Sequence, residues 1–252
     1  SAYTLAHLNE YLHRFNDIKN CKLQIQLNVG SHFFFEIAKI RALRYLVTEL
    51  LAQFGLKPEF KLFAEPGIRN KTLYDYNVNL LRTSSECMSA ILGGADTIAN
   101  QSYDHLFHES NAFGERIARN QLLILKEESY FNSTLNAAND SYYVEAITKQ
   151  MAENALALFK NIEASGGFLK QLINGTIQRK IKENTAKEQA LFDSGELVLL
   201  GSNKFPNEQD TMKTVMTKDP FPAKRREKTL IEPIVPRRLA KVYEQNRLNN
   251  EA

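Results

Sequence analysis

Residues 23–54 read LQIQLNVGSHFFFEIAKIRALRYLVTELLAQF, and this stretch decides the fold class. Residues 23–28 alternate Leu and Ile with polar side chains, which predicts a short strand with one apolar face, ending at Gly30. The residues that follow place apolar side chains on one face at helical spacing as far as Phe54. We therefore expect a strand followed by a long helix, with Ser31 as the N-cap of that helix.

The same order of strand and helix recurs twice downstream. Residues 60–64 and 96–99 have the length and apolar content of short strands. Amphipathic helices are predicted over residues 76–92 and 112–128, and Gly93-Gly94 is expected to end the first of them. Strands that alternate with long helices are typical of parallel α/β architecture, in which each crossover helix covers the strands that it connects.

The rest of the chain divides into a mainly helical part and an irregular C-terminal extension. Residues 206–238 hold five of the seven prolines and a basic cluster at 224–228, so we expect a tether that lies over the surface and outside the core. We accordingly predict a domain over residues 1–205 and an extension over residues 206–252. The further predicted elements are helices over residues 2–16, 142–164, 167–173, 176–193 and 237–248, and a last strand over residues 197–200.

The composition excludes several classes of protein. A chain of 252 residues that is 43% hydrophobic can bury a sizeable core, which excludes a disordered protein. The net charge of +3 is too small for a protein that binds nucleic acid mainly by neutralising phosphates. No apolar stretch approaches the roughly 18 residues of a membrane span, and the first residues have amphipathic spacing. We expect a cytoplasmic protein with neither a nucleic-acid nor a membrane partner, and with Cys21 and Cys87 as small core residues.

No single motif in the sequence carries chemistry. The GxGxxG, P-loop, HExxH and GxSxG patterns are all absent. His105 and His108 stand at i,i+3 and could share a metal ion, but no third ligand follows at a readable spacing, so we expect no metal site. The residue types alone therefore indicate a soluble α/β domain without indicating its reaction.

Six blocks in order give the chain a resemblance to a known family. They are FFFEIAKIRA at 33–42, NLLRTS at 79–84 with GGAD at 93–96, GERIARNQ at 114–121, SYYVE at 141–145, GGF at 166–168, and AKEQ at 186–189 with FDSG at 192–195. Together they resemble the methylmalonyl-CoA mutase family, and specifically its small, non-catalytic subunit.

The resemblance implies a TIM-type (β/α)8 barrel whose bore is threaded by the CoA chain of the substrate. In the family, a helix like AYTLA at residues 2–6 follows the strand that carries the catalytic Tyr-His pair. The chain therefore resembles the second half of the barrel plus the linker, and we expect a partial barrel with long helices. An open ring leaves strand edges unpaired, so the isolated chain is expected to self-associate or to bind the rest of its subunit.

The chain departs from the family's pattern where the resemblance places the substrate. Catalytic subunits read GGTQSLH where residues 93–99 read GGADTIA, so Asp96 replaces a ligand-facing glutamine and Ala99 a histidine. A carboxylate close to an anionic acyl group disfavours binding. Gln24 stands where catalytic chains have a small serine and would help to fill the bore if it points inward. We expect no catalytic residue and no metal ligand. The candidate vestigial substrate-binding residues are Arg82, Asp96, Arg119 and Asn120.

The same resemblance implies a function in a complex. The cobalamin-binding signature DxHxxG is absent, so adenosylcobalamin is expected only in the catalytic partner and no cofactor in this chain. We interpret the chain as a small subunit that stabilises the methylmalonyl-CoA mutase large subunit, in a complex that interconverts methylmalonyl-CoA and succinyl-CoA. Two alternatives stay open: an acyl-CoA-binding domain with a residual active site, and a stand-alone module that binds a partner outside any mutase.

Overall fold

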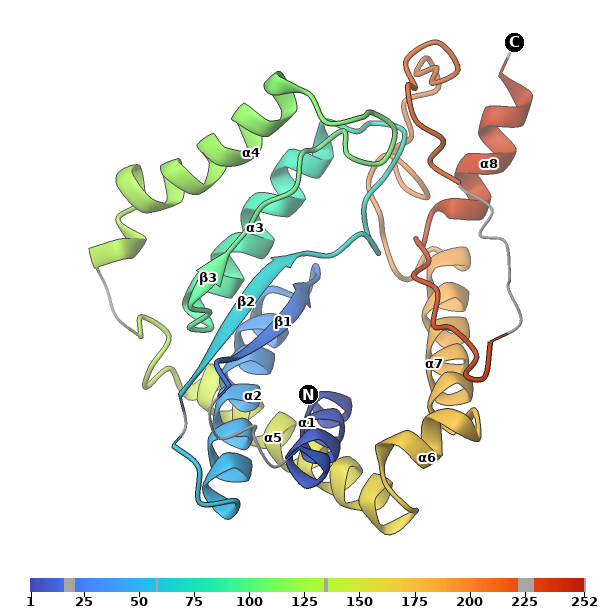
Figure 1. Ribbon diagram of the computed structural model, residues 1–252. Coiled ribbons are helices and arrows are strands. Elements are labelled where there is room, and N and C mark those ends of the chain that lie inside the picture. Colours follow the sequence, from blue (N-terminus) through green and yellow to red (C-terminus); the bar gives the residue numbers. More distant parts are fainter. Residues whose placement is uncertain (16–20, 58, 134–135, 222–228, 252) are drawn as a thin grey trace.

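The computed structural model describes residues 1–15, 21–57, 59–133, 136–221 and 229–251. At its centre lies a parallel three-stranded sheet in the order β1-β2-β3 (Figure 1). The strands are β1 (Leu23–Val29), β2 (Phe60–Pro66) and the short β3 (Thr97–Ile98). β1 pairs with β2 along its whole length, with Leu23 opposite Phe60, whereas β3 pairs only with the middle of β2. The expected α/β class with parallel strands is confirmed.

Two crossover helices cover one face of the sheet. They are α2 (Phe33–Gln53), which links β1 to β2, and α3 (Val78–Leu92), which links β2 to β3. The alternation in the strands decides the burial, because every second side chain of a strand points to the same face. Ile25, Val29 and Leu62 are buried against the helices. Each such apolar side chain contributes about 1.5–3 kcal/mol on full burial.

The boundaries of α2 and α3 follow local hydrogen bonding. The first turn of α2 is closed by the N–H of Glu36, which donates to the carbonyl of His32. Ser31 therefore lies one residue too early to be the N-cap, and the prediction of that cap is wrong. Gly93 and Gly94 end α3 as expected, and Gly94 has a φ of +81°.

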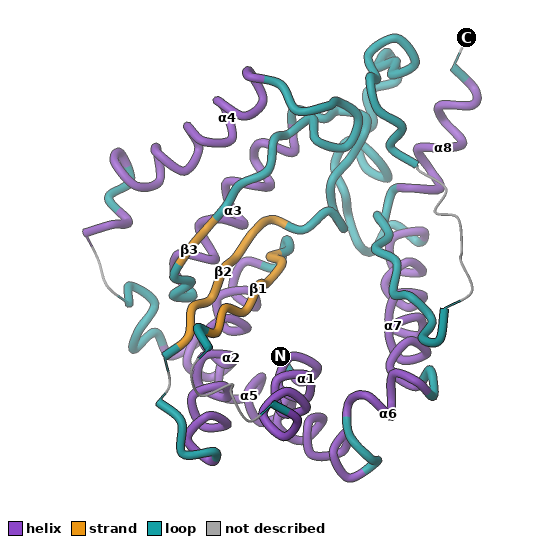
Figure 2. The backbone as a smooth tube through the Cα atoms, viewed as in Figure 1, coloured by secondary structure: helices purple, strands orange, loops and turns teal. Residues whose placement is uncertain are grey.

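Further helices surround this unit (Figure 2). The predicted helix over residues 112–128 is helical throughout, but its last five residues form a π-helical turn instead of continuing α4 (Ala112–Leu123). α5 (Tyr142–Ala164) packs along α1 (Ala2–Arg14) and α2, and α6 (Phe168–Ile173) and α7 (Thr176–Asp193) continue to the side of the molecule away from α4 (Figure 1). These elements are α1 (Ala2–Arg14), α4 (Ala112–Leu123), the π-helix Ile124–Glu128, the 3-10 turn Phe131–Ser133, α5 (Tyr142–Ala164), α6 (Phe168–Ile173), α7 (Thr176–Asp193) and α8 (Lys241–Asn250).

The strand predicted over residues 197–200 is wrong. These residues lie in a succession of turns, with a single bridge between Leu200 and Lys204. The side chain of Asn203 takes the place of a neighbouring strand: it accepts from the N–H of Leu199 and donates to the carbonyls of Phe192 and Leu197. The backbone groups are thus satisfied without a sheet.

The C-terminal extension contributes to the core, contrary to the prediction. Met212 is 1% exposed and packs with Leu73, Tyr74 and Phe107 in a second apolar cluster. A proline-rich composition predicts a lack of regular structure, but it does not exclude single apolar anchors such as Met212. The basic cluster at 224–228 lies outside the described residues. In the described ranges, no helix combines the length and the apolar character needed to span a bilayer.

Candidate functional site

The guanidinium of Arg82 makes hydrogen bonds to other residues of the same chain. Arg82 lies in the second turn of α3, where its guanidinium donates to Oγ1 of Thr72 and Oδ1 of Asn79, each at 2.8 Å, and to the carbonyl of Leu200 at 2.7 Å. These three bonds hold Arg82 against the loop that follows β2 and against the turns after α7. Its role in this structure is to join those segments.

Asp96 also makes hydrogen bonds within the protein, to α2 and to β2. Its Oδ2 accepts from the backbone N–H of Leu62 and from the guanidinium of Arg44, both at 2.7 Å. Burial would raise the pKa of Asp96, but these hydrogen bonds outweigh it, and the pKa lies below its ordinary value. Arg44 also donates to the carbonyl of Gly94. The negative charge at Asp96 is therefore compensated by α2.

The four candidate residues lie at three separate places in the structure: on α3, directly before β3, and on α4. Arg119 and Asn120 are exposed on α4, whose buried face is formed by Gly114 and Ala118. Arg82 lies in the second turn of α3, whereas Asp96 lies four residues past the end of that helix, which rises about 1.5 Å per residue. Among the described contacts, no hydrogen bond or ion pair joins any two of the four.

A buried polar cluster that sequence reasoning missed lies at the carboxyl end of β2. Nζ of Lys71 is 2.7 and 2.9 Å from the carboxylate oxygens of Glu86, and the amide of Asn70 donates to the same carboxylate at 2.7 Å. Lys71 is 5% exposed and Glu86 1%. Burial lowers the pKa of Lys71 and raises that of Glu86, while the attraction between them opposes both shifts. The signal for this cluster was the run of four polar residues at 69–72, which begins three residues after β2 ends.

The face of the sheet away from α2 and α3 is polar. Gln24, Gln26 and Asn28 of β1 are exposed there, and the amide of Gln26 donates to Oε1 of Glu65 on β2 at 2.9 Å. Gln24 therefore points away from the helices, on the face that would line the bore of a closed barrel. Bores of such barrels are more often filled by branched apolar side chains.

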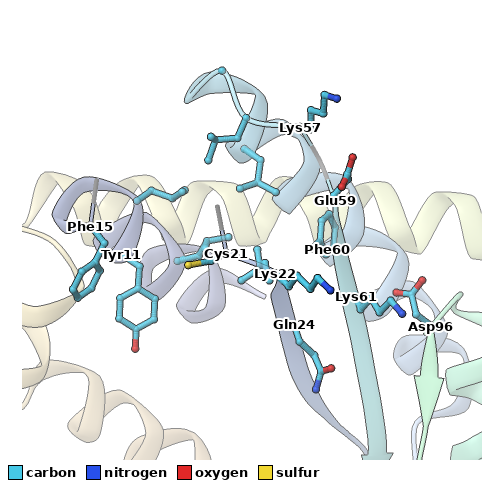
Figure 3. A pocket seen from close by; sticks show the side chains of 16 residues that line it. Tyr11, Phe15, Cys21, Lys22, Gln24, Lys57, Glu59, Phe60, Lys61 and Asp96 are labelled. Carbon is cyan, nitrogen blue, oxygen red and sulfur yellow. The ribbon is translucent and has the colours of Figure 1, made fainter. Parts of the chain in front are cut away.

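A hollow of about 1320 Å³ lies at the amino-terminal ends of β1 and β2 (Figure 3). Its wall combines aromatic and aliphatic side chains with lysines, and Asp96 alone of the four candidates lines it. The labelled lining residues are Tyr11, Phe15, Cys21, Lys22, Gln24, Lys57, Glu59, Phe60, Lys61 and Asp96. The hollow is thus at the end of the strands opposite to the Lys71–Glu86 cluster.

The cysteines and histidines differ in their surroundings. Cys87 is buried, which raises its pKa to about 12 and keeps it a thiol. Cys21 is exposed in the segment before β1, so its prediction as a core residue is wrong. His108 contacts Oδ2 of Asp104 at 3.1 Å and the carbonyl of Val215 at 2.7 Å. In the described part of the chain, no three side chains of His, Cys, Asp or Glu gather closely enough to hold a metal ion.

Comparison with known proteins decides the family. The model of the methylmalonyl-CoA mutase family matches residues 2–246 of the 252. The chain belongs to the methylmalonyl-CoA mutase family. The resemblance found in the six sequence blocks is thereby confirmed over nearly the whole chain.

Relatives of this mutase-family chain carry the names of different subunits. It is 36% identical over 191 residues to the methylmalonyl-CoA mutase small subunit of Porphyromonas gingivalis, covering 74% of this chain and 31% of that protein. It is 35% identical over 216 residues to the methylmalonyl-CoA mutase of Cereibacter sphaeroides, covering 81% and 30%. It is 32% identical over 219 residues to the probable methylmalonyl-CoA mutase large subunit of Mycobacterium bovis, covering 83% and 29%. The chain thus spans about a third of the length of these relatives.

Proposed function

We propose that this mutase-family chain is part of the barrel of a small, non-catalytic subunit that stabilises the catalytic large subunit of a methylmalonyl-CoA mutase. The observation that carries the proposal is the identity of the residue at position 96 and its hydrogen bonds within the chain. A carboxylate stands at the position where the sequence resemblance implies a ligand-facing glutamine, and it accepts hydrogen bonds from Arg44 and from the backbone N–H of Leu62. The name of the Porphyromonas gingivalis relative supports the same assignment.

The sheet supports a role in assembly. In the residues that the structure describes, β1 and β3 are the edges of a three-stranded parallel sheet whose polar face is exposed. Strand edges present backbone N–H and C=O groups that are satisfied by another strand or by water. The proposal therefore has these strands form the second half of a TIM-type barrel, completed by the rest of the subunit and held against the large subunit.

The chemistry of the reaction belongs to the partner in this proposal. Adenosylcobalamin bound by the large subunit would supply the radical chemistry that interconverts methylmalonyl-CoA and succinyl-CoA. This chain's residues would hold structure: Arg44 fixes the start of β3 through Asp96, and Arg82 fixes the loop after β2. None of the four candidate residues would move a proton or contact the reacting carbon.

Reconstitution tests the assignment. The polypeptide that carries this chain is mixed with the large subunit, and the complex is followed by size-exclusion chromatography with light scattering. We expect a stable complex, a higher melting temperature of the large subunit, and mutase turnover only when the large subunit and adenosylcobalamin are present. Turnover by this polypeptide alone with adenosylcobalamin, or no complex at micromolar concentrations, would show the proposal to be wrong.

Calorimetric titration with methylmalonyl-CoA and with CoA tests the alternative of a residual site. The proposal predicts no binding tighter than about millimolar. Tighter binding that is lost in Arg82→Ala and kept in the exposed control Arg179→Ala would favour the acyl-CoA-binding alternative instead.

A further inference from the structure

The loop after β2 lies between α3 and the C-terminal segment that contains α8. We call residues 67–77 the β2 loop and residues 237–251 the C-terminal strap. The β2 loop precedes α3, and the strap contains α8; the two lie side by side although about 170 positions separate them in the sequence (Figure 1). Loops at the carboxyl ends of parallel strands are where barrels of this class build their sites, so whatever fixes this loop matters for any ligand at that end.

The strap bonds to the backbone of alternate loop residues. The N–H of Leu239 donates to the carbonyl of Arg69 at 2.9 Å. The guanidinium of Arg238 donates to the carbonyl of Lys71 at 3.3 Å, and the N–H of Leu73 donates to Oε1 of Glu244 at 2.7 Å. These contacts give partners to three successive polar groups along one edge of the loop.

The strap side chains that make these bonds are themselves a buried ion pair. Arg238 is 6% exposed and Glu244 0%, and the guanidinium donates to Oε2 of Glu244. A buried pair with both partners is tolerated, whereas removing one partner leaves an uncompensated buried charge. Both partners belong to the strap, so undocking would leave them paired but would expose them to water and break their bonds to Lys71 and Leu73.

The opposite edge of the β2 loop bonds to α3. The N–H of Thr72 donates to Oδ1 of Asn79 at 3.1 Å, and Lys71 is paired with Glu86.

The strap also contacts the loop at Tyr74. The hydroxyl of Tyr74 donates to Glu251, and the ring of Tyr74 lies 3.9 Å from the guanidinium of Arg247. The strap thus covers the loop whose side chains hold the Lys71–Glu86 cluster.

We infer that the C-terminal strap acts as an internal ligand of the β2 loop, so that this loop keeps its conformation only while Arg238 and Glu244 are docked on it. Without the strap, the carbonyls of Arg69 and Lys71 and the N–H of Leu73 turn to water, and water reaches the Lys71–Glu86 pair. The conformation of the β2 loop then depends on the C-terminal strap. The inference goes beyond the proposed function, because it involves no second subunit and no cofactor.

Amide hydrogen exchange on Glu244→Gln tests the inference. The decisive probe is the amide of Thr72, because its partner is Asn79 on α3 and not the strap. We expect its exchange to rise at least about tenfold, together with that of α8, while β1 and α2 keep theirs. The matched control is Glu183→Gln, which removes a charge from an exposed ion pair with Lys180 and should leave the loop unchanged.

A milder variant decides the question if Glu244→Gln does not fold. Glu251→Gln weakens the bonds from Tyr74 and from the N–H groups of Met212 and Lys213 at the far end of the strap. It should raise exchange at Thr72 by a smaller factor in the same pattern. Unchanged exchange at Thr72 while α8 exchanges freely, or an equal rise in β1 and α2, would overturn the inference.

Discussion

At the scale of single residues, two buried ion pairs stand out in this chain. Lys71 and Glu86 lie almost fully inside, and so do Arg238 and Glu244. Such pairs add little net stability over apolar side chains of the same volume, because both charges lose their hydration. Their contribution is to penalise any arrangement in which the partners separate.

We therefore predict that Lys71→Met costs more than the double substitution Lys71→Met with Glu86→Leu. The single variant leaves the Glu86 carboxylate buried without its lysine partner, although the Asn70 amide still donates to it, and we expect a loss of about 3–5 kcal/mol in the free energy of unfolding. The double variant should recover at least about half of this loss. Urea denaturation at neutral pH measures both, and equal losses in the two variants would contradict the argument.

A second residue-scale prediction concerns pH. Burial would raise the pKa of Glu251, but the hydrogen bonds from Tyr74, Lys213 and Met212 outweigh it and lower the pKa below its ordinary value of 4.5. Because the folded pKa is the lower one, the carboxylate stabilises the fold fully above pH 4.5 and less as the pH falls through the folded pKa.

The free energy of unfolding of the native chain should therefore fall more steeply below pH 4.5 than that of Glu251→Gln. Urea denaturation at several pH values checks this, and Tyr74→Phe, which removes one donor, should give an intermediate slope. Parallel pH profiles for the native chain and Glu251→Gln would exclude the role that we give to this carboxylate.

At the scale of elements, the approach of α3 to α2 depends on one glycine. A Cβ at Gly93 would lie 2.9 Å from Cβ of Ile40 and 3.2 Å from the carbonyl of Ile37. Both neighbours belong to α2, whose Ile40 is fully buried in the core cluster that includes the sheet. Only hydrogen at this position lets the two helices meet.

We predict that Gly93→Ala destabilises the fold by about 1–3 kcal/mol, as overpacking of a filled core does. The matched control is Gly30→Ala, whose Cβ would meet only Oε1 of Glu36 at an ordinary 3.5 Å. Thermal unfolding of the two variants compares them directly. A melting temperature of Gly93→Ala equal to that of Gly30→Ala would show that α3 can shift at no cost.

The sequence predicts those elements whose side chains repeat with a clear period. β1, β2, α2 and α3 are found almost to their ends, because alternation in the strands and the apolar stripe in the helices are local signals. Residues 197–200 are equally apolar, yet Asn203 satisfies their backbone from four residues away. The π-helical turn after Leu123 likewise has no periodic signal.

The candidate site was less predictable than the elements, for a physical reason. Asp96 and Arg44 are 52 positions apart, and Leu73 and Glu244 are 171 apart. No local pattern indicates which distant charge a side chain will meet. Arg82 lies on α3 and Asp96 directly before β3, but the partners that hold them in the structure follow only from the tertiary arrangement.

At the scale of the whole molecule, the sheet of the described residues is open, with β1 and β3 as its edge strands. Within the described ranges it holds three parallel strands, helices cover one face, and the polar side chains of β1 and β2 lie on the other. The strap and α5 to α7 close the periphery but add no strand there. The free edges of β1 and β3 are therefore the surfaces by which this chain is expected to associate.

We predict that the chain alone self-associates as its concentration rises, and that adding the large subunit replaces these assemblies with a defined complex. The physical reason is that an exposed edge strand pairs with another strand unless charge, bulge or cover prevents it. Light scattering over a range of concentrations measures the self-association. The variant Gln26→Pro tests the edge of β1: proline removes a backbone donor and disfavours strand pairing, so this variant should self-associate less. If the chain stays monomeric at all concentrations while the amides of β1 are protected from exchange, the edge is already covered from within the chain, and the dependence on a companion subunit is wrong.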